Sequence, residues 1–158
     1  MIVKPNKPLI FATDLHWSGD GRGIVSSHST NHSVTISTYP DAPVTDNEWG
    51  AEHLFLSAVT SSLLKTYLEL ARKMKFENDA FECTATGQAE IVEGKFKFTF
   101  IHVYPKACVI NDTDIEKAQI ALEKAKKTCP ICNSINAEIV QHPEVVIAKR
   151  KNEVVSKK

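Results

Sequence analysis

Two alternating runs of residues on either side of a Glu-Gly dipeptide constrain the fold of this chain most strongly. Small and apolar side chains occupy every second position of the first run, and aromatic rings dominate every second position of the next. These positions are Phe81, Cys83, Ala85, Gly87, Ala89 and Ile91, then Phe96, Phe98, Phe100, His102 and Tyr104. A period of two is typical of strands with one buried face, and Glu93-Gly94 suits a tight turn. We predict an antiparallel hairpin over about 81–104, with its aromatic face covered by a helix.

Two other segments show helical spacing. Residues 51–75 contain neither proline nor glycine, and the small residues of 57–62 allow another backbone to approach closely. The residues expected on the inward face of this first helix are Leu54, Ala58, Ser61, Ser62 and Leu68. The second helix is predicted over about 113–128, with Thr113 and Glu116 forming a capping box.

The rest of the chain completes an α+β domain. A β region is expected over about 9–38 around a glycine-rich turn, and a final strand interrupted at Pro143 is expected within 129–148. The charged residues 149–158 are predicted to be a solvated tail. A length of 158 residues with 42% hydrophobic composition is typical of one globular domain, which we place over 1–158.

The charge balance excludes some classes of partner. Nineteen basic residues against nineteen acidic ones provide no field for binding nucleic acid or anionic lipid. The sequence contains no apolar run of the roughly 20 residues that a spanning helix requires, and its first residues lack the apolar region of a signal peptide. We therefore expect a cytoplasmic protein, without membrane or nucleic-acid partners, whose four cysteines are reduced.

The segment Cys129-Pro-Ile-Cys132 carries the clearest chemical signal. Pro130 suits the first position of a helix, so Cys129 becomes its predicted N-cap, where free N–H groups and the helix dipole favour a thiolate. Cys132 is then placed to condense with an oxidised Cys129. The alternative is that both cysteines are buried packing residues. A thioredoxin-like interpretation lacks the βαβ pattern that such a motif needs.

The remaining cysteines and the histidines are expected to have structural roles and not catalytic or metal-binding ones. Cys83 and Cys108 are expected to pack in the core, and the six histidines are expected at the surface because they form no helical ligand pair. A closed zinc site needs four ligands, and no second Cys-x-x-Cys is present. The sequence contains no P-loop, dinucleotide fingerprint or nucleophile elbow. No metal or cofactor is predicted.

Three segments together resemble one known family. These are Trp17-Ser-Gly-Asp-Gly21 in the N-terminal turn, Gly50-Ala-Glu-His-Leu-Phe-Leu-Ser57 at the start of the first helix, and Cys129-Pro-Ile-Cys-Asn-Ser-Ile135. Their order resembles that of the OsmC/Ohr family of osmotically inducible and organic-hydroperoxide-resistance proteins. The resemblance implies an intertwined homodimer with curved antiparallel sheets around two long central helices, and with active sites at the dimer interface.

The resemblance also implies roles for particular residues. Peroxidases of the family attack the peroxide with a cysteine in the first helix, resolve it with the cysteine of the Cys-Pro segment, and are reduced by a dithiol such as lipoamide. The resolving position corresponds to Cys129 and the family's glutamate to Glu52, but the attacking position holds Ser62. Arg22 lies in the turn of the family's arginine, whose own position matches Gly19 or Asp20.

These residues leave two functions open. In the first, the chain is a thiol peroxidase that reduces organic hydroperoxides, with Cys129 attacking, Cys132 resolving, and Glu52 or Arg22 setting the charge environment. In the second, the serine at position 62 has ended catalysis, and the dimer holds a small hydrophobic ligand.

Overall fold

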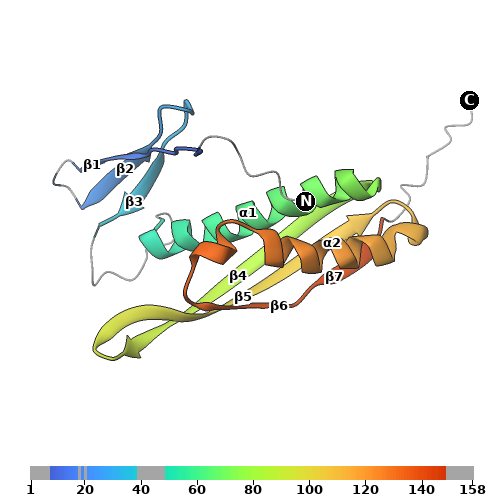
Figure 1. Cartoon of the computed structure of the whole chain (residues 1–158). Coiled ribbons are helices and arrows are strands. Elements are labelled where there is room, and N and C mark those ends of the chain that lie inside the picture. The colour runs from blue at the N-terminus through green and yellow to red at the C-terminus, as the bar shows by residue number, and fades with distance from the viewer. Residues whose placement is uncertain (1–7, 18, 20, 39–48, 149–158) are drawn as a thin grey trace, which may run out of the picture. The chain divides into compact units, whose positions relative to one another are not determined.

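The structure is a computed structural model, and it separates into two compact units (Figure 1). The first covers residues 1–54 and the second covers 55–158, and each is described by itself. The residues described are 8–17, 19, 21–38 and 49–148. The charged tail 149–158 lies outside them, as does Asp20. No helix in these ranges has the length and apolarity that crossing a bilayer requires.

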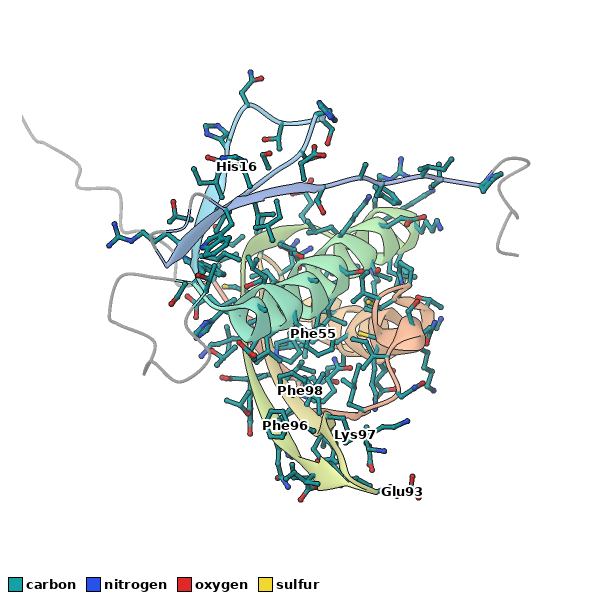
Figure 2. All side chains as sticks on the ribbon, turned by 90° about the vertical axis from the view of Figure 1, so that its left-hand side faces the viewer. His16, Phe55, Glu93, Phe96, Lys97 and Phe98 are labelled. Carbon is teal, nitrogen blue, oxygen red and sulfur yellow. The ribbon has the colours of Figure 1, made fainter. Side chains whose placement is uncertain are left out.

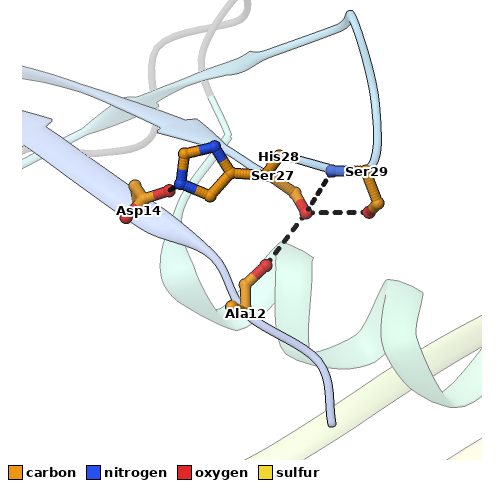
Figure 3. A network of polar contacts seen from close by, with 5 residues as sticks. All are labelled: Ala12, Asp14, Ser27, His28 and Ser29. Atoms are coloured by element: carbon orange, nitrogen blue, oxygen red, sulfur yellow. Dashed lines mark hydrogen bonds and ion pairs between the residues drawn. The ribbon is translucent and has the colours of Figure 1, made fainter.

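The N-terminal unit is a three-stranded antiparallel sheet in the order β1-β2-β3. Its strands are β1 (Asp14–Trp17), β2 (Arg22–Ser26) and β3 (Val34–Ser37), all within the segment expected to be β. Figure 3 shows the contacts beyond the β1–β2 pair, where the Ser27 hydroxyl donates to the Ala12 carbonyl at 2.9 Å and His28 Nε2 lies 3.3 Å from the Asp14 carboxylate. These contacts hold the two chain segments together at the surface.

The C-terminal unit places two helices on one face of a sheet (Figure 1). Its elements are α1 (Ala51–Met74, entering from the first unit), β4 (Asn78–Val92), β5 (Lys95–Val109), a 3-10 turn (Asp112–Asp114), α2 (Ile115–Thr128), a second 3-10 turn (Cys132–Ser134), β6 (Glu138–Gln141) and β7 (Glu144–Ile147). The α+β class is confirmed, and the long hairpin is the β4–β5 pair.

The sheet of this unit is mixed, because two parallel strands join the antiparallel β4–β5 pair. Both β6 and β7 pair with β5 in parallel, because α2 carries the chain back across the sheet before β6 begins, as parallel pairing requires. The break between β6 and β7 falls beside Pro105, a fully buried residue of β5 that has no N–H to donate to a neighbouring strand.

The buried stripe of α1 differs from the one predicted. Val59, Leu63, Tyr67 and Ala71 face the core at intervals of four residues. Ser61 is exposed and Leu68 is 45% exposed in the single chain. The predicted and the observed stripes both satisfy helical spacing. The observed stripe faces the sheet because its larger side chains bury more apolar surface there.

A β-bulge divides the aromatic residues of β5 between two faces, which corrects the single aromatic face predicted from alternation. Gln88 pairs with Phe100 and Ala89 pairs with Phe98, which leaves Thr99 as an extra residue. On one side of the bulge Phe98 faces α1. On the other side, Ile101 and the alternate residues that follow it are buried, and His102 and Tyr104 lie on the opposite face. An extra residue in one strand reverses the side on which each later side chain lies.

The ring of Phe98 on the neighbouring strand β5 covers the space beside Gly87 of β4. A Cβ atom added there would lie 2.5 Å from Phe98 Cε1 and 3.2 Å from Leu56 Cδ2. Phe98 has little freedom to move, since its ring packs on Phe55 of α1 with centroids 5.0 Å apart (Figure 2).

We therefore expect Gly87→Ala to lower the free energy of unfolding by about 1–3 kcal/mol through overpacking, measured by urea denaturation. Thr86→Ala, at the exposed neighbouring position, is the control and is expected to change stability by less than about 0.5 kcal/mol. Equal effects of the two substitutions would contradict this account of the contact.

The start of α2 also differs from the prediction, because the Thr113–Glu116 capping box does not form. Asp114 occupies the cap position without a side-chain cap hydrogen bond, and Thr113 belongs to the preceding 3-10 turn. The buried Asp114 carboxylate instead accepts a hydrogen bond from the Lys117 ammonium at 2.8 Å. This local pairing competes with capping for the same carboxylate.

Candidate functional site

The central contact of the candidate site joins α1 to the end of α2. The Cys129 thiol donates to Ser62 Oγ across 3.2 Å, although the two residues are 67 positions apart in the sequence. Cys129 is fully buried and Ser62 is half-buried. The two positions that the family resemblance assigned to the attacking and resolving cysteines therefore face each other.

Local backbone structure places the Cys129 side chain. Its N–H donates to the Ala125 carbonyl at 2.8 Å, which ends α2, and its extended backbone then turns the chain. Its sulfur accepts the Cys132 N–H at 3.4 Å, and its carbonyl accepts the Asn133 N–H at 3.0 Å. The sulfur thus receives a backbone hydrogen bond of the kind that an N-cap side chain makes.

The segment after Pro130 forms a single 3-10 turn and not the helix that was expected. A turn of three residues has too few aligned peptide groups for a macrodipole, and Cys129 sits at the carboxyl end of α2, where the dipole disfavours negative charge. The groups available to stabilise a thiolate are therefore local: the Cys132 N–H and the Ser62 hydroxyl, which can rotate to donate once the sulfur loses its proton.

Cys132 completes a pair of thiols. Its side chain is half-buried, and burial, followed by a hydrogen bond to Cys129 and the charge of Cys129, raises the pKa of the Cys132 thiol to about 12. Because Cys132 keeps its proton at neutral pH, a thiolate in this pair belongs on Cys129. The two thiols therefore differ in how readily they lose a proton.

Glu52 and Arg22 lie in the N-terminal unit. Glu52 is exposed in the first turn of α1, and Arg22 is exposed at the start of β2. Gly19 lies in the turn before β2 with a positive φ of 89°. The structure thus brings together Ser62, Cys129 and Cys132, and it describes Glu52 and Arg22 in a separate unit.

The other cysteines occupy opposite faces of the sheet. Cys83 is half-buried on the face that meets the helices, and burial raises the pKa of its thiol. Cys108 is half-buried on β5, opposite Ala80 and Val146. Neither lies in the Ser62–Cys129–Cys132 cluster.

The cluster can perform redox chemistry at sulfur. A thiolate on Cys129 has a hydroxyl and a backbone N–H within reach, and a second thiol lies close enough to share a hydrogen bond with it. Periodicity alone did not reveal the Ser62–Cys129 contact, since no local pattern links positions on separate helices. The family resemblance was the signal that paired them.

Comparisons with known proteins agree with this architecture. The model of the OsmC-like protein family matches residues 44–142. An OsmC-like protein from Vibrio cholerae has 15% identity and a TM-score of 0.76, with 86% of this chain and 99% of that one covered. An OsmC-like protein from Mycoplasma pneumoniae has 16% identity and a TM-score of 0.74, covering 90% and 99%.

A third solved structure carries a more specific description. It is an organic hydroperoxide resistance protein from Elizabethkingia anophelis, with 19% identity, a TM-score of 0.68, and 91% of this chain and 100% of that one covered. No curated protein matches the chain by sequence. At these identities the solved structures establish the fold.

Proposed function

Because the chain belongs to the OsmC-like family, we propose that it is a thiol-dependent reductase of organic hydroperoxides, with Cys129 as the attacking residue and Cys132 as the resolving one. The observation that carries the proposal is the Cys129 sulfur, which contacts the Ser62 hydroxyl and the Cys132 N–H beside a second thiol. The description of a similar structure as an organic hydroperoxide resistance protein supports the choice of substrate.

The proposed cycle balances in three steps. The Cys129 thiolate attacks the terminal oxygen of the hydroperoxide, the O–O bond breaks, and the alkoxide leaves as an alcohol after taking a proton, so Cys129 becomes a sulfenic acid. The Cys132 sulfur then attacks the Cys129 sulfur, forming a disulfide and releasing water. An external dithiol reduces this disulfide by exchange and is itself oxidised to a disulfide.

Oxidation of Cys129 is expected to lower the pKa of the Cys132 thiol, which favours the order in which Cys129 reacts first. In the reduced pair, the charge of Cys129 contributes to the high pKa of Cys132. Oxidation replaces the Cys129 thiolate with a sulfenic acid and so removes that charge contribution, whereas the larger contribution of burial remains. Glu52 and Arg22 are proposed to adjust the charge around the site, as the family resemblance implies.

The first test counts thiols. Reduced protein is mixed with one equivalent of cumene hydroperoxide, and free thiols are measured before and after in denaturant. We expect two of the four cysteines to be lost in the wild type and none in Cys129→Ser over the same time, with Cys108→Ser as a control that still loses two. Unchanged wild-type thiols would overturn the peroxidase proposal.

A second function is favoured by the complete burial of Cys129 and by the serine at position 62. In this alternative, the chain is a dimer that holds a small hydrophobic ligand without turnover. The thiol count separates the two, since a binding protein keeps all four thiols while ordinary free cysteine reacts.

The chain is further proposed to act as a homodimer. Ile91 and Phe96 are cross-strand partners and are 75% and 73% exposed in the single chain. Phe96 lies near the hairpin end (Figure 2), and α1 carries the exposed Leu68. Apolar surface of this kind is typical of an interface.

We expect light scattering to give twice the 17.5 kDa mass of one chain. Phe96→Glu is expected to shift the protein toward the monomer, because it introduces a charge into the apolar surface. Lys97→Glu, next to Phe96 and also exposed, is the control and should leave the mass unchanged. A wild-type mass of one chain would contradict the dimer.

A further inference from the structure

The face of β5 that points away from the helices carries a row of rings. Ile101 and Val103 are buried in the core, so the residues that alternate with them lie on the other side of the sheet. His102 there is joined by His142, which follows β6 and is fixed in place by a 2.8 Å hydrogen bond from its N–H to the Val103 carbonyl. The sheet thus brings together two histidines that are 40 positions apart.

The two imidazoles are held by their neighbours. His142 stacks on Tyr104, with ring centroids 4.7 Å apart and planes 12° apart, and on His102 at 5.5 Å and 20°. Phe100 stacks on the other ring, His102, at 6.4 Å. These ring contacts keep the two nitrogens that face each other close together before any ion binds.

The separation of these nitrogens suits a metal ion. His102 Nδ1 and His142 Nε2 lie 3.2 Å apart. Two imidazole nitrogens at about 2.0–2.1 Å from one ion, at angles between square-planar and tetrahedral, are separated by about 2.9–3.4 Å. Because the two nitrogens now face each other in a hydrogen bond, binding requires each ring to turn until its lone pair leaves the N···N line and points at the ion.

We propose that His102 and His142 form a surface site for a divalent transition-metal ion of the class that imidazole prefers, namely Cu²⁺, Ni²⁺ or Zn²⁺. Water supplies the other ligands, since no cluster of three or more metal-ligating side chains occurs in the described ranges. The site is independent of the Ser62–Cys129–Cys132 cluster, so it does not rest on the proposed function.

Binding requires a change of tautomer and no net loss of a proton from the neutral pair. Whichever ring donates in the present hydrogen bond moves its proton to its other nitrogen, which frees the lone pair for the ion. The charged groups paired nearby on this face of the sheet are Glu138, opposite Phe100, Glu82, opposite Lys106, and the Lys106–Glu144 ion pair at 3.1 Å.

The test is a calorimetric titration with Ni²⁺ above neutral pH. All proteins carry Cys129→Ser and Cys132→Ser, which removes the thiol pair as a competing ligand set. We expect one Ni²⁺ per chain in this background, and His102→Gln or His142→Gln to weaken binding by roughly 100-fold, since each breaks a chelate. His28→Gln removes an exposed histidine of the N-terminal unit and is expected to leave the affinity unchanged.

A second measurement avoids substitutions at the site. Zn²⁺ added to the unmodified full chain is expected to shift the ring ¹⁵N resonances of His102 Nδ1 and His142 Nε2 and to leave those of His28 in place. The proposal is overturned if the chain takes up no Ni²⁺, if both glutamine variants bind Ni²⁺ as tightly as their parent, or if Zn²⁺ leaves the His102 and His142 rings unchanged.

Discussion

Replacing Ser62 with cysteine is expected to move the peroxide-induced disulfide, so that Cys129 is linked to the introduced thiol and no longer to Cys132. The Ser62 hydroxyl lies 3.2 Å from the Cys129 sulfur, so a thiol there stands beside Cys129 from the start. A thiol at this position can also be oxidised, which a serine hydroxyl cannot. We expect hydroperoxide consumption to accelerate by on the order of tenfold or more, a barrier lower by at least about 1.4 kcal/mol.

Peptide mapping of the oxidised Ser62→Cys protein identifies the pair of linked cysteines, and a coupled peroxide assay gives the rate. Ser61→Cys is the matched control, because Ser61 is the preceding residue of α1 but is exposed and donates to the Ser57 carbonyl. A Ser62→Cys protein that still linked Cys129 to Cys132 at the wild-type rate would show that position 62 has no access to the chemistry.

Replacing Cys132 with serine is expected to abolish the disulfide and to leave Cys129 as a sulfenic acid. No second thiol then contacts the Cys129 sulfur within the described part of the chain, because Ser62 supplies only a hydroxyl. One equivalent of cumene hydroperoxide is expected to consume one thiol per chain in place of two. Mass spectrometry should find the mass of one added oxygen at Cys129, and dimedone should trap it.

Cys83→Ser is the control for this experiment, since Cys83 is half-buried on β4 and outside the cluster. It is expected to behave like the wild type, with two thiols lost and no dimedone adduct. If Cys132→Ser still lost two thiols, then another cysteine would be resolving Cys129, and the assigned role of Cys132 would be wrong.

Sequence periodicity predicted the large elements of this fold well, because each depends on local spacing. The β4–β5 hairpin follows from alternation around Glu93-Gly94, and α1 follows from a proline-free stretch with helical spacing. The parallel pairing of β6 and β7 with β5 was not predicted, since it depends on the path of α2 across the sheet.

The candidate site was predictable only in part. Cys129 and Cys132 are conspicuous in the sequence, and the family resemblance placed Ser62 opposite Cys129. The pairing of His102 with His142 was missed, because it depends on the register of two strands far apart in the chain. The absence of a helix after Pro130 was also missed, since proline at that point is compatible with both a helix and a single turn.

The extra residue at Thr99 determines which side chains in the first half of β5 face the helices. If Thr99 instead took its place in the ladder without a bulge, β5 would alternate strictly, and every side chain between Thr99 and the turn would lie on the opposite face. Phe98 would leave Phe55, and Lys97 would turn toward the helix. Deleting Thr99 would leave both halves of the strand on their present faces, because Gln88 and Ala89 already pair with Phe100 and Phe98, so alignments of this hairpin with its relatives must place gaps by side-chain environment and not by residue similarity alone.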